Sequence, residues 1–139
     1  MTFQEKSALT MTALLTLVFG WYFALVLGVV AGSPEREIAY TALMIVAAVI
    51  VAILATVSHV ILALLFRSDA NAYDERDRHV DLRSERIGGY VLAVGVFAGI
   101  GLAMVRADRF WIAQALIAAL VLAEITSGVI KVVLYRRGA

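Results

Sequence analysis

The chain contains no cysteine, so it has no disulfide framework, no thiolate nucleophile and no sulfur ligand for a metal. Charged residues are also scarce, at 17% of the 139 residues, whereas 63% are hydrophobic and the mean hydropathy is +0.92. This composition leaves too little polar surface to coat a soluble domain of this size. It therefore predicts a protein whose solvent is lipid.

The sequence also lacks the patterns of two classes of function, nucleic-acid binding and catalysis. The net charge is +1, and no run of lysine and arginine is interleaved with aromatic residues, which excludes a nucleic-acid-binding surface. The pair Ser58-His59, and Ser127 near Glu124, come with no evident oxyanion hole or set of metal ligands. We therefore expect no enzymatic activity.

Four long apolar runs nearly exhaust the chain. The only proline, Pro34, lies just after the first run, where Gly32-Ser33-Pro34 marks a turn. Because a spanning helix needs about 20 largely apolar residues, we predict one all-α domain, residues 1–139, folded as an integral membrane four-helix bundle of up-down-up-down topology. The predicted spans are residues 8–31, 38–66, 87–105 and 110–135. The alternative for the first run is a cleaved signal peptide. Signal cores are only about 7–15 residues long, which is shorter than the run at residues 8–31.

The basic residues are distributed unevenly between the two ends of these spans. Nine lie at one end and three at the other, and short loops rich in lysine and arginine stay in the cytoplasm. We therefore expect both termini in the cytoplasm of a multi-pass protein. The nine are Lys6, Arg67, Arg76, Arg78, Arg83, Arg86, Lys131, Arg136 and Arg137, and the three are Arg36, Arg106 and Arg109.

The charged segment 68–86 is predicted to be cytoplasmic. Asp74 and Glu75 favour helix initiation, because acids stabilise the positive end of a helix, so we expect one continuous helix from Asp74 to Val105 whose first turns project into the cytoplasm. Its acidic stripe should attract the basic end of the chain. The candidate interaction residues are Asp74, Glu75, Arg76, Asp77, Asp81, Arg136 and Arg137. The alternative is an ordinary solvated helix face crossed by ion pairs.

Small residues mark two expected packing faces. Gly95 and Gly99 form a G-x-x-x-G motif in span 87–105, and Gly20 and Gly28 belong to an i+4 stripe of small residues in span 8–31. Such faces let membrane helices approach closely. We expect one of them to mediate self-association into a homo-oligomer.

Ionisable groups inside a span cost roughly 2.5–3.5 kcal/mol and are candidate sites by default. Three qualify: His59, Glu124 and Lys131. Glu124, Ser127 and Lys131 share one helix face, and at about 1.5 Å per residue Lys131, His59 and Glu124 lie roughly 6, 10 and 16 Å below the cytoplasmic surface. Tyr90 enters its span at a depth close to that of Lys131 and could add a hydroxyl. A site should therefore lie between spans 38–66 and 110–135, in their cytoplasmic half.

Two interpretations of these groups stay open. The first is a proton- or ion-responsive site in which Glu124 titrates and His59 acts as a relay. The second is a structural Glu–His or Glu–Lys pair that locks two helices together, with the Lys131 ammonium reaching the headgroups. A metal or haem site needs more nitrogen ligands than one buried histidine supplies, so we expect no metal and no cofactor.

Two short signatures carry a family resemblance: DERD at residues 74–77 followed by R-x-x-R-I-G-G-Y at residues 83–90, and the terminal YRRG at residues 135–138. With these motifs the chain resembles, over nearly its full length, a family of small four-span bacterial inner-membrane proteins to which no activity is assigned. The resemblance implies a bacterial inner membrane and a structural role for the first motif, and it transfers no catalytic residue. Small multidrug-resistance exporters also have four spans, but their essential carboxylate lies in the first span, which has none here.

The first functional hypothesis is a small inner-membrane module, without catalytic activity, that contacts itself or an unidentified membrane or cytoplasmic protein through the cytoplasmic helix. The second is a proton-coupled small transporter or ion-responsive sensor that uses Glu124 and His59. The lipid bilayer is the expected surrounding in both cases.

Overall fold

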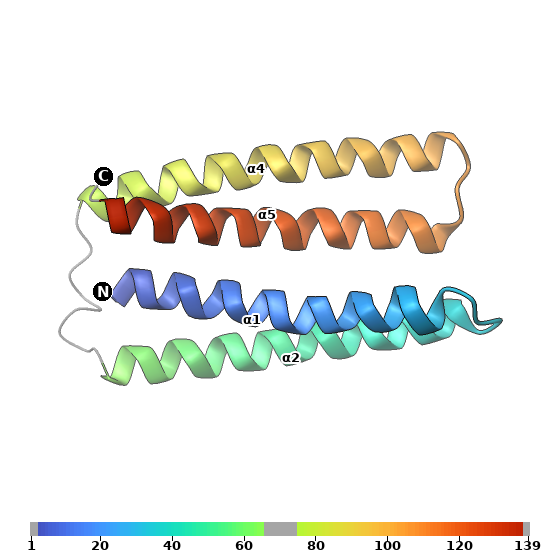
Figure 1. The fold of residues 1–139 in the computed structure, drawn as a ribbon, viewed down its shortest axis with the longest axis horizontal. Helices are drawn as coiled ribbons and strands as arrows, with labels where there is room; N and C mark the ends of the chain where they lie inside the picture. Colours follow the sequence, from blue (N-terminus) through green and yellow to red (C-terminus); the bar gives the residue numbers. More distant parts are fainter. Residues whose placement is uncertain (1–2, 66–74, 138–139) are drawn as a thin grey trace.

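The computed structural model describes residues 3–65 and 75–137, and it describes the side chains of all of these except residues 3, 4, 36 and 37. The predicted start of the third helix at Asp74 therefore lies outside the described residues. The elements in chain order are α1 (Phe3–Leu25), a π-helical segment η1 (Val26–Val30), α2 (Arg36–Leu65), α4 (Glu75–Met104) and α5 (Arg109–Arg137) (Figure 1). The described residues contain no strand, and the prediction of an all-α four-helix bundle is confirmed.

The four helices run antiparallel to their chain neighbours, and the N- and C-terminal ends lie at the same end of the molecule, called here the terminal end (Figure 1). Helix α4 packs on α5, α5 packs on α1, and α1 packs on α2, whereas α2 touches α5 only slightly. The helices thus follow the spatial order α4, α5, α1, α2. The opposite end, where the two short turns lie, is called the turn end.

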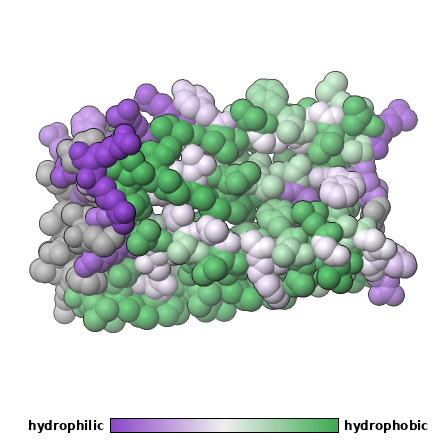
Figure 2. Space-filling model, in the orientation of Figure 1, coloured by the Kyte–Doolittle hydropathy of each residue, from purple (hydrophilic) through white to green (hydrophobic). Residues whose placement is uncertain are grey.

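Each helix is long and apolar enough to cross a bilayer: the apolar spans are Glu5–Val30, Ile38–Leu65, Glu75–Met104 and Arg109–Arg137. Large apolar side chains such as Leu17, Phe97 and Met104 point outward and are exposed, the reverse of a water-soluble bundle. Figure 2 shows the resulting hydrophobic belt, with hydrophilic residues gathered at both ends. These are the features of a multi-pass membrane protein.

The turn between α4 and α5 is very tight, as the four residues between the predicted spans 87–105 and 110–135 imply. Arg106 adopts a left-handed conformation with φ 56°, and the side-chain oxygen Oδ1 of Asp108 accepts a hydrogen bond of 3.0 Å from the backbone N–H of Phe110. This hydrogen bond satisfies one of the free backbone N–H donors at the start of α5. Because the turn is so short, α4 and α5 have to pack as antiparallel neighbours.

The best-packed core lies in the turn half of the bundle. Tyr22, Val26 and Val30 from α1 and η1 bury against Ala47 of α2 and Phe110 of α5. The aromatic rings meet edge to face, with centroids 5.3 Å apart for Tyr40 and Phe110 and 5.1 Å apart for Phe110 and Trp111. The core fills the space among α1, α2 and α5 in this half, and space for a polar site lies in the terminal half.

The two predicted glycine faces have different outcomes. A Cβ atom at Gly99 would lie 2.6 Å from Leu116, and one at Gly95 would overlap Ala119, so the α4 motif is a true contact face against α5. At Gly20 and Gly28 nothing lies within 4 Å, and within this chain the predicted packing role of these two glycines is wrong.

The reason is the rotation of α1 about its own axis. Its buried residues are Leu15, Tyr22, Val26 and Val30, a different face from the small-residue stripe, because the large Tyr22 ring fills the core between helices. The wider turn of η1 changes the register again after Leu25. Self-association through Gly20 and Gly28 stays a prediction.

Candidate functional site

A cavity of about 500 Å³ occupies the terminal half of the molecule, between α1, α4 and α5, with one residue of α2 at its edge. That residue is His59. The other polar side chains in the lining are Ser7, Thr12, Ser84, Glu85, Glu124, Ser127 and Lys131. All four predicted span-buried polar residues besides Tyr90, namely His59, Glu124, Ser127 and Lys131, line this cavity. The predicted position of the site between α2 and α5 is wrong, because α5 packs on α1 and touches α2 only slightly, so the cavity lies between α1, α4 and α5 instead.

Glu124 lines this cavity with an exposed side chain. Among residues 3–65 and 75–137 it makes no hydrogen bond or ion pair. The proposed Glu–His or Glu–Lys pair is therefore not formed, since both candidate partners bind other groups.

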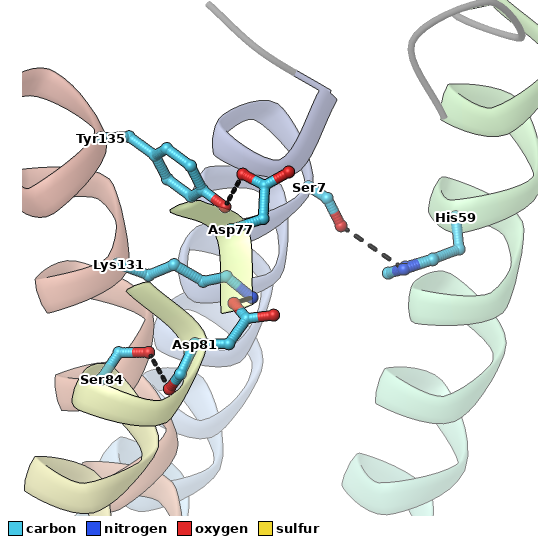
Figure 3. Close-up of polar contacts among 7 residues, drawn as sticks. All are labelled: Ser7, His59, Asp77, Asp81, Ser84, Lys131 and Tyr135. Atoms are coloured by element: carbon cyan, nitrogen blue, oxygen red, sulfur yellow. Dashed lines mark hydrogen bonds and ion pairs between the residues drawn. The ribbon is translucent and has the colours of Figure 1, made fainter. Parts of the chain in front are cut away.

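His59 is held by α1. Its ring atom Nε2 lies 3.4 Å from the hydroxyl Oγ of Ser7, a hydrogen bond between residues 52 positions apart in sequence (Figure 3). His59 is exposed towards the cavity, whereas Ser7 is buried. An imidazole bonded through one nitrogen to a hydroxyl can gain or lose a proton at the other, which is the arrangement a relay needs.

Lys131 binds Asp81 of α4. The Nζ–Oδ1 distance is 2.5 Å, and the two side chains are 24% and 21% exposed. The ammonium does not reach for the headgroups as the structural interpretation supposed, because a carboxylate is available across the α4–α5 interface. Asp81 was predicted to contact another protein, so the sequence did not lead us to expect its pairing with Lys131.

The sequence did contain the signal for this pair. Two antiparallel helices joined by a tight turn bring together residues at similar distances from it. Asp81 stands 26 residues before Ala107 and Lys131 stands 24 residues after it. The same register explains the hydrogen bond of 2.8 Å from the Tyr135 hydroxyl to Asp77 Oδ1, which lies next to the Lys131–Asp81 pair in Figure 3.

The predicted attraction between the charged start of α4 and the end of α5 is therefore present, but through different residues. Tyr135 and Lys131 make the contacts, whereas Arg136 turns to α1 and binds Glu5 Oε1 at 3.3 Å. Glu75, Arg76 and Arg137 are exposed. Interaction with another protein through this surface stays a prediction.

Tyr90 does not belong to the site. Its side chain is 66% exposed and is not in the cavity lining, so the prediction of a buried hydroxyl is wrong. Depth alone suggested it, but two residues along a helix turn a side chain by about 200°. Because Gly88 faces α5, Tyr90 has to face outward.

The charges of the lining residues do not cancel. Glu85 and Glu124 contribute two carboxylates, and the Lys131 ammonium is already paired with Asp81. In the described part of the chain no group of three or more His, Asp or Glu side chains is placed to hold a metal ion. The arrangement favours a proton or a small cation bound to a carboxylate.

These features define a multi-pass, four-helix protein with a polar cavity in one half of its span. No protein-family model matches the chain, and neither a curated protein nor a solved structure matches it. The resemblance to the four-span bacterial family thus stays a prediction based on its short motifs.

Proposed function

We propose that the protein is an ion-responsive membrane module, acting as a proton-coupled small transporter or as a sensor, in which Glu124 takes up the ion and His59 relays it. The observation that carries this proposal is the Glu124 carboxylate, which lines a polar cavity and has no partner among the described residues. A carboxylate at membrane depth is expensive. A purely structural one would be expected to have a cation or a donor beside it.

The uneven distribution of basic residues supports an inner-membrane location with the termini in the cytoplasm. The cavity then lies in the cytoplasmic half, and ions reach Glu124 from that side. The packed core around Tyr22 and Phe110 closes the other side. A transporter has to open this core during its cycle, whereas a sensor only has to report the occupancy of the cavity.

The test of transport uses proteoliposomes that contain a pH-sensitive dye and are given a proton gradient. We expect Glu124→Gln to abolish protein-dependent proton flux, and Glu75→Gln, a matched change on the exposed surface outside the cavity, to leave it intact. Flux that persists in the Glu124→Gln protein would refute transport through this residue.

The test of sensing needs no flux. Infrared difference spectra between acidic and neutral samples of the purified protein should contain a carboxyl band that is absent from the Glu124→Gln protein and present in the Glu75→Gln protein. A parent protein that shows neither flux nor this band has no ion-responsive Glu124, and the proposal fails.

A further inference from the structure

A second cavity, of about 550 Å³, lies in the turn half of the molecule between α1 and α5 and is bounded at one point by Leu102 of α4. We call it the apolar groove. Nearly all its lining side chains are hydrocarbon, among them Phe19, Phe23, Leu122 and Ile125. The groove thus differs in chemistry from the polar cavity, and the proposed ion site does not use it.

One lining residue is out of place in this apolar surface. Gln114 is only 4% exposed, and its Oε1 accepts a hydrogen bond of 3.1 Å from the Tyr22 hydroxyl. Within the described residues its Nε2 is buried without an acceptor. The amide cannot simply be reversed, because the Tyr22 hydroxyl proton would then lose its acceptor.

The position of this unused donor points to the molecule that would use it. Gln114 is five residues beyond the start of α5 at Arg109, or about 8 Å along the helix axis. The headgroup layer is about 5–8 Å thick on each side of the hydrocarbon core. With Arg109 placed at the water boundary of the bilayer, Gln114 lies at the inner edge of the headgroup layer, where the ester carbonyls of phospholipids are found.

The length of the groove agrees with this placement. From Gln114 the lining continues along α5 to Ile125, eleven residues further, which is about 16 Å. One leaflet of the hydrocarbon core is about 15 Å thick. The groove thus has one hydrogen-bond donor at its headgroup end and an apolar channel as long as one leaflet.

We propose that the apolar groove binds one acyl chain of an ester-linked phospholipid from the leaflet at the turn end, and that a small rotation of the buried Gln114 side chain presents Nε2 to the ester carbonyl, which accepts a hydrogen bond from it. A helix from a second copy of the chain is the alternative occupant, but its backbone carbonyls already accept hydrogen bonds within the helix and give Gln114 Nε2 no acceptor.

The test compares ester-linked and ether-linked phospholipids with brominated acyl or alkyl chains, because the ether lipid has the same chain but no carbonyl. The chain has two tryptophans, and only Trp111 lines the groove. In the full-length Trp21→Phe protein, bromine quenching of Trp111 fluorescence reports lipid in the groove. The converse Trp111→Phe protein reports lipid beside Trp21, which is exposed on the outside, and serves as the matched control.

We expect the ester lipid to bind about three- to tenfold more tightly than the ether lipid at Trp111, the range that one hydrogen bond supplies, and equally at Trp21. Gln114→Leu should remove the preference. Ala118→Phe, which adds bulk to the groove one turn from Gln114 and leaves the amide in place, should reduce quenching of Trp111 by both lipids.

Equal affinities for the two lipids at Trp111 in a protein with Gln114 intact would overturn the proposal, whether or not the Gln114→Leu protein folds. Strong protection of Trp111 from both lipids, together with a dimer that Ala118→Phe dissociates, would show that a second copy occupies the groove instead and would also overturn it.

Discussion

At the residue scale, the terminal half of the molecule contains both paired and unpaired charged side chains. The Lys131 ammonium and the Asp81 carboxylate are paired and half-buried, whereas Glu124 has no partner in the described chain. A paired charge stabilises the fold only as long as its partner is present. An unpaired one costs free energy and is not needed for folding.

The Lys131–Asp81 pair predicts that substitutions of its two members have coupled effects on the free energy of unfolding. Asp81→Asn should lower the free energy of unfolding by about 1–3 kcal/mol, less than for a fully buried pair because about a quarter of each side chain is exposed. Adding Lys131→Met should recover part of this loss, since the ammonium is no longer stranded. Unfolding in detergent gives the free energy of unfolding of Asp81→Asn, of Lys131→Met and of the double variant. Strictly additive effects would show that the two charges do not interact.

For the unpaired Glu124 carboxylate we expect a change in stability of the opposite sign. Glu124→Gln removes a charge from the bundle without leaving a partner behind, so the thermal stability in detergent should stay equal or rise. A melting temperature that falls by several degrees would reveal a partner for Glu124 and would favour the structural interpretation over the ion site.

At the element scale, the sequence predicted some contacts of α4 and α5 and missed others. The glycine motif at Gly95 and Gly99 identified a true interface, because the tight turn leaves α5 as the neighbour of α4. The stripe through Gly20 and Gly28 was just as regular, yet α1 turns another face inward. A small-residue stripe shows that a helix can be approached closely, but not that its neighbour does so.

The glycines of α4 give a matched pair of substitutions. Gly95→Ala should lower the free energy of unfolding by about 1–3 kcal/mol, because the added methyl overlaps Ala119. Gly101→Ala in the same helix has open space at its Cβ position and should be neutral or stabilising by up to about 1 kcal/mol. Equal effects of the two changes would show that α4 and α5 are further apart than this packing requires.

At the scale of the whole molecule, the terminal half contains a polar cavity and the turn half contains a packed core beside an apolar groove. Asp77 and Asp81, which were expected to face a partner, bind Tyr135 and Lys131 within the chain. In the described chain the exposed part of the predicted interaction surface consists of Glu75, Arg76, Arg136 and Arg137, of which Arg136 binds Glu5. Charge reversal at Glu75 and Arg76 should release a co-purifying partner if this surface binds one, and a retained partner would contradict that hypothesis.

The orientation can be tested directly because the chain has no cysteine. With both termini in the cytoplasm, Arg137→Cys should react with a membrane-impermeant maleimide in inverted membrane vesicles. Ser33→Cys, in the turn after α1, should react only from the opposite side. Labelling with the reverse pattern would place the cavity in the other leaflet and would invalidate the proposed direction of ion access.

The sequence by itself determined the number of helices, their approximate ends, the two short turns and the antiparallel pairing of α4 with α5. Hydropathy, turn residues and the spacing about a tight turn are local properties that can be read along the chain. Only the tertiary structure decided that Ser7 binds His59, that Tyr22 binds Gln114 across 92 positions, and that Tyr90 faces outward. These outcomes depend on which helices are neighbours and on how each is rotated about its axis, and both are set by packing between distant segments.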